Sequence, residues 1–97
     1  MKEETYLKRL ESLNLNKNSF VYKKLFLASL SFSILKRGKV LYRIRPVVVY
    51  GKGRYSRNYD HTSNLCDCLA KMRISYYIGN DAPRGGNYGT FIDIIIQ

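Results

Sequence analysis

The chain has 97 residues and a formal net charge of +10 at pH 7. This length suits one domain, residues 1–97, with its own core. A hydrophobic content of 45% argues against an intrinsically disordered chain in spite of the charge. Such a positive excess repels itself and therefore favours a negatively charged partner.

The positive charge is concentrated in the middle of the sequence. No acidic residue occurs at the 48 positions between Glu11 and Asp60, whereas both flanking segments are close to neutral. A block of one sign favours nucleic acid first, and an anionic membrane or an acidic protein surface after that. The eleven cations of the block are Lys17, Lys23, Lys24, Lys36, Arg37, Lys39, Arg43, Arg45, Lys52, Arg54 and Arg57.

The first predicted element is an amphipathic helix over residues 2–13, followed by a polar connection. Residues 28–34 then alternate apolar side chains with serines, which predicts a half-buried strand. Residues 20–27 either begin this strand or form a short helix, because Val21 and Leu25 also fit helical spacing.

Residues 40–50 predict a second strand, joined to the first by the turn KRGK. A hairpin that pairs Phe32 with Ile44 keeps one face apolar, whereas a shift of one residue places Arg43 on that face. We therefore expect the first register, which leaves serines and arginines on the outer face. Pro46 cannot donate to a strand ladder, so it predicts an edge or a bulge there.

The rest of the chain predicts a second helix and a second hairpin. The resulting order, α-β-β-α-β-β, predicts a single α+β domain whose antiparallel sheet has helices packed on one face. The remaining segments are a basic loop at 51–61, a helix at 62–73, strands at 75–78 and 90–96, and a turn at 79–89.

The outer face of the first hairpin and the loop after it predict a nucleic-acid surface. Arginine makes bidentate contacts to phosphate, serine donates single hydrogen bonds, and tyrosines in the loop can stack on bases. The alternative is a solvated face that only keeps the protein soluble. The predicted binding residues are Ser31, Ser33, Lys36, Arg37, Lys39, Arg43, Arg45, Lys52, Arg54, Tyr55 and Arg57.

This interface predicts two measurable properties. Six phosphate contacts would make the logarithm of the binding constant fall with the logarithm of salt concentration at a slope of about −5. Because Arg43 and Arg45 should face solvent, we expect their joint substitution by glutamate to abolish binding and leave the fold intact.

No catalytic residue, cofactor or metal site is predicted. Asp60, His61, Cys66 and Cys68 lack the spacing and number of zinc ligands, and nothing marks a serine as a nucleophile. We therefore expect a protein that is not an enzyme.

The cysteines and the apolar segments bear on location. On the predicted helix Cys66 and Cys68 point about 200° apart, so they cannot form a disulfide with each other. This predicts a reducing, cytoplasmic location. Residues 23–35 resemble a secretory signal, but serines interrupt them, and their apolar run is too short to cross a bilayer. We therefore expect no membrane partner.

Residues 31–49, SFSILKRGKVLYRIRPVVV, resemble half of a LAGLIDADG homing endonuclease. That family has a strand of the S-F-x-I kind, a turn, a strand containing R-P and a helix. The resemblance extends over residues 20–95 and implies a sheet that lies in the major groove of DNA. Leu25–Ser29 stand where the family carries its catalytic acid, so the resemblance implies binding without cleavage. It leaves a homodimer open.

The sequence therefore predicts a non-catalytic protein that binds DNA or RNA. One alternative is a small inhibitor encoded by a phage or mobile element, similar to an anti-CRISPR protein, which would bind an acidic or nucleic-acid-binding protein. A further alternative is a ribosome-associated protein, which needs the same basic surface.

Overall fold

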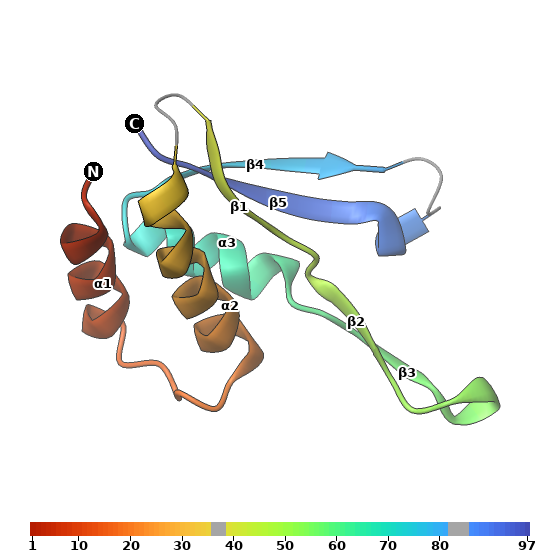
Figure 1. Cartoon of the computed structure of the whole chain (residues 1–97). Coiled ribbons are helices and arrows are strands. Elements are labelled where there is room, and N and C mark those ends of the chain that lie inside the picture. The colour runs from red at the N-terminus through yellow and green to blue at the C-terminus, as the bar shows by residue number, and fades with distance from the viewer. Residues whose placement is uncertain (36–38, 82–85) are drawn as a thin grey trace.

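The computed structural model describes residues 1–35, 39–81 and 86–97, which form a small α+β domain (Figure 1). The described elements follow the order α-α-β-β-β-α-β-β, with short 3₁₀ helices between them. They are α1 (Glu3–Ser12), α2 (Phe20–Ser29), η1 (Leu30–Ile34), β1 (Val40–Ile44), β2 (Val47–Tyr50), η2 (Gly53–Tyr55), β3 (Arg57–Asp60), α3 (Thr62–Lys71), β4 (Ser75–Asn80), η4 (Gly86–Gly89) and β5 (Thr90–Ile95).

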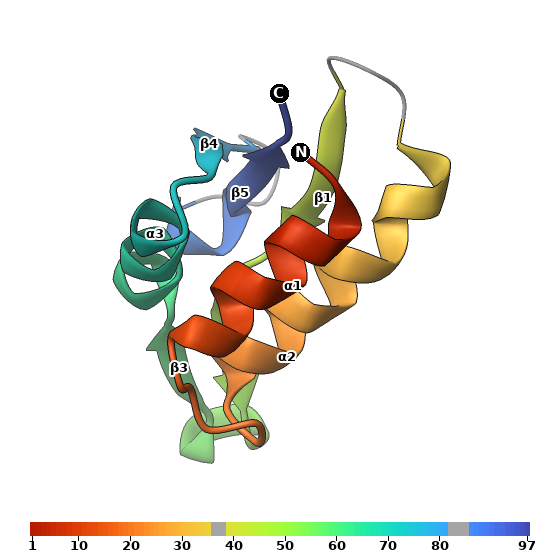
Figure 2. The same cartoon turned by 90° about the vertical axis from the view of Figure 1, so that its left-hand side faces the viewer.

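The strands form two antiparallel sheets. In the larger one β5 lies between β1 and β4, and the smaller one is the hairpin of β2 and β3. Figures 1 and 2 show α1, α2 and α3 on the same side of the three-stranded sheet. The predicted α+β class and antiparallel pairing are confirmed, whereas the predicted order of elements is wrong.

One hydrophobic cluster joins the helices to the sheet. Tyr6 and Leu10 are fully buried on the inner stripe of α1, and Ile92 and Ile94 alternate along β5 so that both face the helices. The Tyr6 hydroxyl donates a 2.6 Å hydrogen bond to the carbonyl of Leu25, which ties α1 to α2. Burial of this hydroxyl raises the pKa of Tyr6 above its ordinary value.

The predicted strand at 28–34 is wrong, because this segment is the end of α2 followed by η1. Val21, Leu25 and Ala28 are buried at helical spacing, whereas Leu30 and Ile34 of the alternating pattern are exposed. The core therefore takes the helical stripe of α2 rather than the period-two pattern. The helix that the sequence left open for residues 20–27 is confirmed.

The segment predicted as one strand at 40–50 is two strands divided at Pro46, where the sequence predicted an edge or a bulge. The first part, β1, pairs with β5, a strand about fifty residues further along the chain, and not with residues 28–34. The second part, β2, leaves the larger sheet and pairs with β3, which the sequence assigned to a loop. The hairpin predicted for residues 28–50 therefore does not form.

The start of α3 is held by a side chain from β3. Oδ1 of Asp60 accepts hydrogen bonds from the backbone N–H of Thr62, at 2.9 Å, and from its hydroxyl. These hydrogen bonds lower the pKa of the Asp60 carboxyl below its ordinary value.

We expect Asp60→Ala to lower the free energy of unfolding by about 0.5–1 kcal/mol at pH 7, as loss of a helix cap does. A carboxyl with a lowered pKa stabilises the fold above its ordinary pKa near 4, and this contribution is lost as the pH falls through the folded pKa. Urea unfolding of the wild type and of Asp60→Ala at pH 7 and pH 3 measures their free energies of unfolding. The difference between the two proteins should be smaller at pH 3. Asp67→Ala, at an exposed position on α3, is the control and should have little effect.

Among the described residues, no helix combines the length and the apolar content needed to cross a bilayer.

Candidate nucleic-acid interface

The two arginines predicted as central contacts lie on the helix-free face of the three-stranded sheet and are paired with acids. Arg43 donates from Nε to Oδ1 of Asp93 at 2.7 Å and from Nη2 to Oδ2 at 3.0 Å. Asp93 is buried, and its hydrogen bonds raise the pKa of Arg43. Arg45 pairs with Asp81 and donates to the carbonyl of Gly89 at 3.1 Å.

The same arginine covers an aromatic ring on that face. The guanidinium carbon of Arg43 lies 3.8 Å from the centroid of Phe91, whose ring also lies against the backbone of Gly79. Phe91 is buried although no described helix packs over it. Arg43 therefore has a structural role that its sequence context did not show. Both arginines have acid partners, and their contact with nucleic acid stays a prediction.

The predicted face of serines and arginines does not form. Ser31 and Ser33 lie on η1, not on a strand paired with the arginines. Lys39 is exposed immediately before β1. Lys36 and Arg37 lie outside the described residues.

The other predicted residues lie together on the hairpin of β2, η2 and β3, residues 47–60, here named the β-arm. Figure 1 shows the β-arm projecting away from the helices and the larger sheet. Its residues 49–60 are all exposed. Within the described part of the chain, its cations form no ion pair with an acid. The predicted residues here are Lys52, Arg54, Tyr55 and Arg57.

The register of the β-arm separates its two faces. Tyr50 is opposite Arg57 and Val48 is opposite Tyr59, so these four side chains share one face. Val49 and Asn58 share the other, where Asn58 donates a hydrogen bond to the hydroxyl of Tyr88. One face therefore contacts Tyr88 of η4, and the other presents tyrosine and arginine.

The turn of the β-arm depends on glycine. Gly51 has a φ of +88° and Gly53 a φ of +56°, both in the left-handed region that favours glycine. A Cβ on Gly51 would also lie 2.8 Å from the carbonyl oxygen of Tyr55. The tight turn places Tyr55 in the same pocket as Tyr50 and Tyr59, which share one face of the β-arm.

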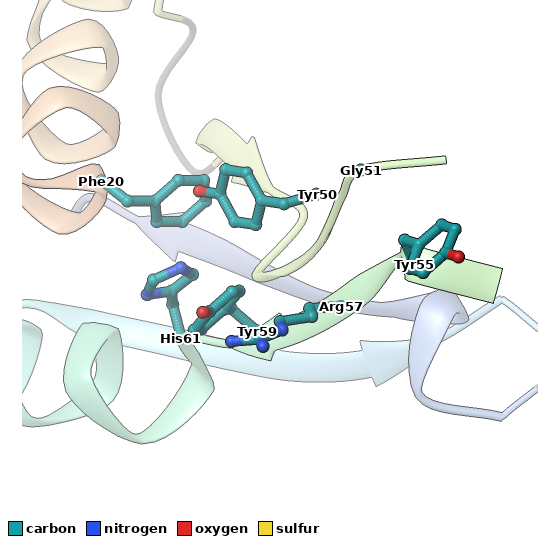
Figure 3. A pocket seen from close by; sticks show the side chains of 7 residues that line it. All are labelled: Phe20, Tyr50, Gly51, Tyr55, Arg57, Tyr59 and His61. Carbon is teal, nitrogen blue, oxygen red and sulfur yellow. The ribbon is translucent and has the colours of Figure 1, made fainter. Parts of the chain in front are cut away.

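A pocket of about 590 Å³ opens where the β-arm meets the helices (Figure 3), here named the aromatic pocket. Phe20 of α2 stacks on His61 with 4.1 Å between ring centroids, and Tyr50 meets Tyr59 edge-to-face at 5.2 Å. Figure 3 shows these four rings at the end nearest the helices and Tyr55 toward the tip. The lining is Phe20, Tyr50, Gly51, Tyr55, Arg57, Tyr59 and His61.

The base of the β-arm carries a polar atom that the fold leaves unsatisfied. The backbone N–H of His61 donates to the carbonyl of Pro46 at 2.9 Å, which closes the hairpin. Nε2 of His61 is buried and has no hydrogen-bond partner within the described part of the chain. Native proteins rarely leave such atoms unpaired away from functional sites.

Sequence reasoning located the tyrosines of this pocket but missed Phe20 and His61 as members of it. Phe20 is some thirty residues away from Tyr50 along the chain, and no local pattern links the two. The only sequence signal for a site here was the short distance in sequence between the tyrosines and the basic residues of the loop.

Residues 1–35, 39–81 and 86–97 contain no group of three or more His, Cys, Asp or Glu side chains that could hold a metal ion. Cys66 and Cys68 are free thiols on α3. Burial raises the pKa of both thiols, which makes them poor nucleophiles at neutral pH.

Comparisons with protein-family models, with curated proteins and with solved structures found no match to this chain. The resemblance to LAGLIDADG endonucleases stays a prediction, and one of the strands that suggested it is the helix η1.

Proposed function

We propose that this protein binds nucleic acid through the β-arm and does not catalyse a reaction. The observation that carries the proposal is an exposed two-stranded ribbon on which three cations have no described acid partner and alternate with exposed tyrosines. Cations bind the phosphates, and tyrosine rings offer stacking surfaces for bases. The cations are Lys52, Arg54 and Arg57.

The distribution of paired and unpaired cations supports this location for the site. Arg43 and Arg45 are neutralised by acids, and Lys17 lies 3.9 Å from a carboxylate oxygen of Glu11. Other cations of the acid-free segment that form no described ion pair are Lys23, Lys24 and Lys39. The positive potential of the acid-free segment is therefore available on the β-arm rather than on the larger sheet.

The proposed location is a reducing compartment, the cytoplasm. Cys66 and Cys68 are both free thiols on one helix, as intracellular proteins usually keep them.

RNA in a ribosomal particle would be one partner of the proposed kind.

We expect the binding constant for a single-stranded oligonucleotide to fall with salt at a logarithmic slope between about −2 and −4. Phosphate contacts by the three arm cations account for a slope of about −2, and further contacts by Lys23, Lys24 and Lys39 would account for a slope of about −4. Gel shifts or fluorescence anisotropy at several salt concentrations measure the slope. A slope flatter than −1 on both DNA and RNA would contradict the proposal.

A second candidate is a protein partner, such as the nucleic-acid enzyme that a small inhibitor would block. It is supported by exposed apolar side chains on successive turns of α2 and η1, because monomeric proteins rarely expose large apolar patches. These side chains are Phe26, Leu27, Leu30 and Ile34, exposed by 41%, 42%, 60% and 79%.

Affinity capture with and without nuclease separates the two candidates. A nucleic-acid binder loses its captured material after nuclease treatment. A protein inhibitor keeps a stoichiometric partner after nuclease, and Leu30→Glu on η1 should then release it while the arm cations do not matter.

A further inference from the structure

We propose that the aromatic pocket receives a single unstacked base, so that the nucleic acid recognised by the β-arm is single-stranded. This inference rests on the proposed function and specifies its substrate. The observation behind it is the juxtaposition of rings from α2, β2, β3 and the arm turn around one open pocket beside unpaired cations (Figure 3).

The size and lining of the pocket suit a planar aromatic group. Its volume of about 590 Å³ lies within the range of sites for small organic ligands. Five of its seven lining residues carry aromatic rings. A flat ring that stacks on Tyr50 or Tyr59, each 47% exposed, would cover apolar surface that now faces water.

The charges around the pocket indicate that the aromatic group is attached to phosphate. Arg57 lines the pocket, and its guanidinium can stack on a base or bind a phosphate oxygen. Lys52 and Arg54 are adjacent in sequence to the lining residues Gly51 and Tyr55, and Nζ of Lys24 lies 5.6 Å from the ring centroid of Phe20. A neutral aromatic ligand or an apolar protein side chain would leave these cations without a role.

The pocket selects against duplexes because paired bases are stacked inside the helix and cannot enter a side pocket without being extruded. Extrusion from a duplex costs a few kcal/mol per base. A single strand has no pairing to lose. We therefore expect the β-arm to bind single strands more tightly than a duplex of the same sequence.

The test uses the full-length protein and an oligonucleotide of about 12 nucleotides, within the site sizes of single-strand binders, with 2-aminopurine at its centre. Binding should quench the fluorescence of the 2-aminopurine, because the base stacks on an aromatic side chain. Tyr59→Leu should weaken single-strand affinity by about 5- to 100-fold. Tyr59→Phe keeps the ring and should restore both affinity and quenching.

Four controls complete the test. Tyr77→Ala removes an exposed tyrosine of β4 outside the pocket and should leave binding unchanged, and thermal unfolding verifies that each variant is folded. Neither substitution at Tyr59 changes charge, so the salt slope should stay the same. A free mononucleotide, titrated as competitor, should bind much more weakly than the oligonucleotide.

The outcomes separate this inference from the proposed function. Equal affinity for single strands and duplex, with no quenching and the expected salt slope, overturns the base pocket and leaves nucleic-acid binding intact. Absence of salt-dependent binding to any nucleic acid overturns both. A mononucleotide that binds as tightly as the oligonucleotide overturns the single-strand assignment and makes the pocket a nucleotide site.

Discussion

Replacement of Arg43 by alanine is expected to lower the melting temperature by roughly 5–15 °C. The substitution leaves the carboxylate of Asp93, only 5% exposed, without its bidentate partner. An unsatisfied buried acceptor of this kind costs about 1–3 kcal/mol, and in a domain of this size that corresponds to the stated change in melting temperature. The same substitution uncovers Phe91. Thermal unfolding followed by circular dichroism measures the effect.

Two controls separate this role from a general effect of charge. Arg57→Ala removes one positive charge from an exposed position and should leave the melting temperature unchanged. The double variant Arg43→Leu/Asp93→Leu removes both partners and should be more stable than Arg43→Ala, because no buried charge remains unpaired. If Arg43→Ala melts at the wild-type temperature, the pair with Asp93 contributes nothing.

Joint substitution of Lys52, Arg54 and Arg57 by alanine is expected to lower affinity for single-stranded nucleic acid by about 100-fold at 0.1 M salt. Each phosphate contact on a single strand contributes about 0.7 to the salt slope, so three contacts contribute about 2. Their contribution is lost near 1 M salt, and a tenfold lower salt concentration restores about two decades of affinity. The slope of the variant should be flatter by about 2, as measured by anisotropy over a salt series.

The matched control is a second triple variant with the same change in net charge. Lys2, Lys8 and Lys71 are exposed on or beside α1 and at the far end of α3, away from the β-arm. Their replacement by alanine should lower affinity much less than the arm variant does. Equal losses in the two triple variants would mean that net charge, and not the β-arm, determines binding.

Elements with one strong local pattern were predicted well. The helices at 2–13 and 62–73 and the strands at 75–78 and 90–96 correspond to α1, α3, β4 and β5 within a few residues. In α1 and α3 the apolar period and the buried face agree, so local preference and packing select the same structure. β5 is buried along its centre, whereas β4 is largely exposed and pairs with β5 along its whole length. The α+β class followed from these elements.

The prediction of a strand at 28–34 was wrong because a helical and a period-two pattern competed in this segment. The serines at period two suggested a strand, yet Ser29 is buried in α2 and donates its hydroxyl to the carbonyl of Phe26 at 2.5 Å. A serine hydroxyl that donates to a carbonyl of its own helix can be buried without leaving an unsatisfied polar group. The partner of β1 is β5, and no local pattern in residues 28–50 could indicate it.

The sequence by itself determined the excess of positive charge, its confinement to one acid-free segment, and the tyrosines that alternate with cations in residues 50–59. Only the tertiary structure decided which cations are neutralised: Arg43 meets Asp93, fifty residues away, while Arg57 meets no described acid. It also decided that Phe20 lies against His61 to close the inner end of a pocket. The physical reason is that net charge is additive along the chain, whereas ion pairing and pocket walls depend on distances of a few ångströms between residues that only folding brings together.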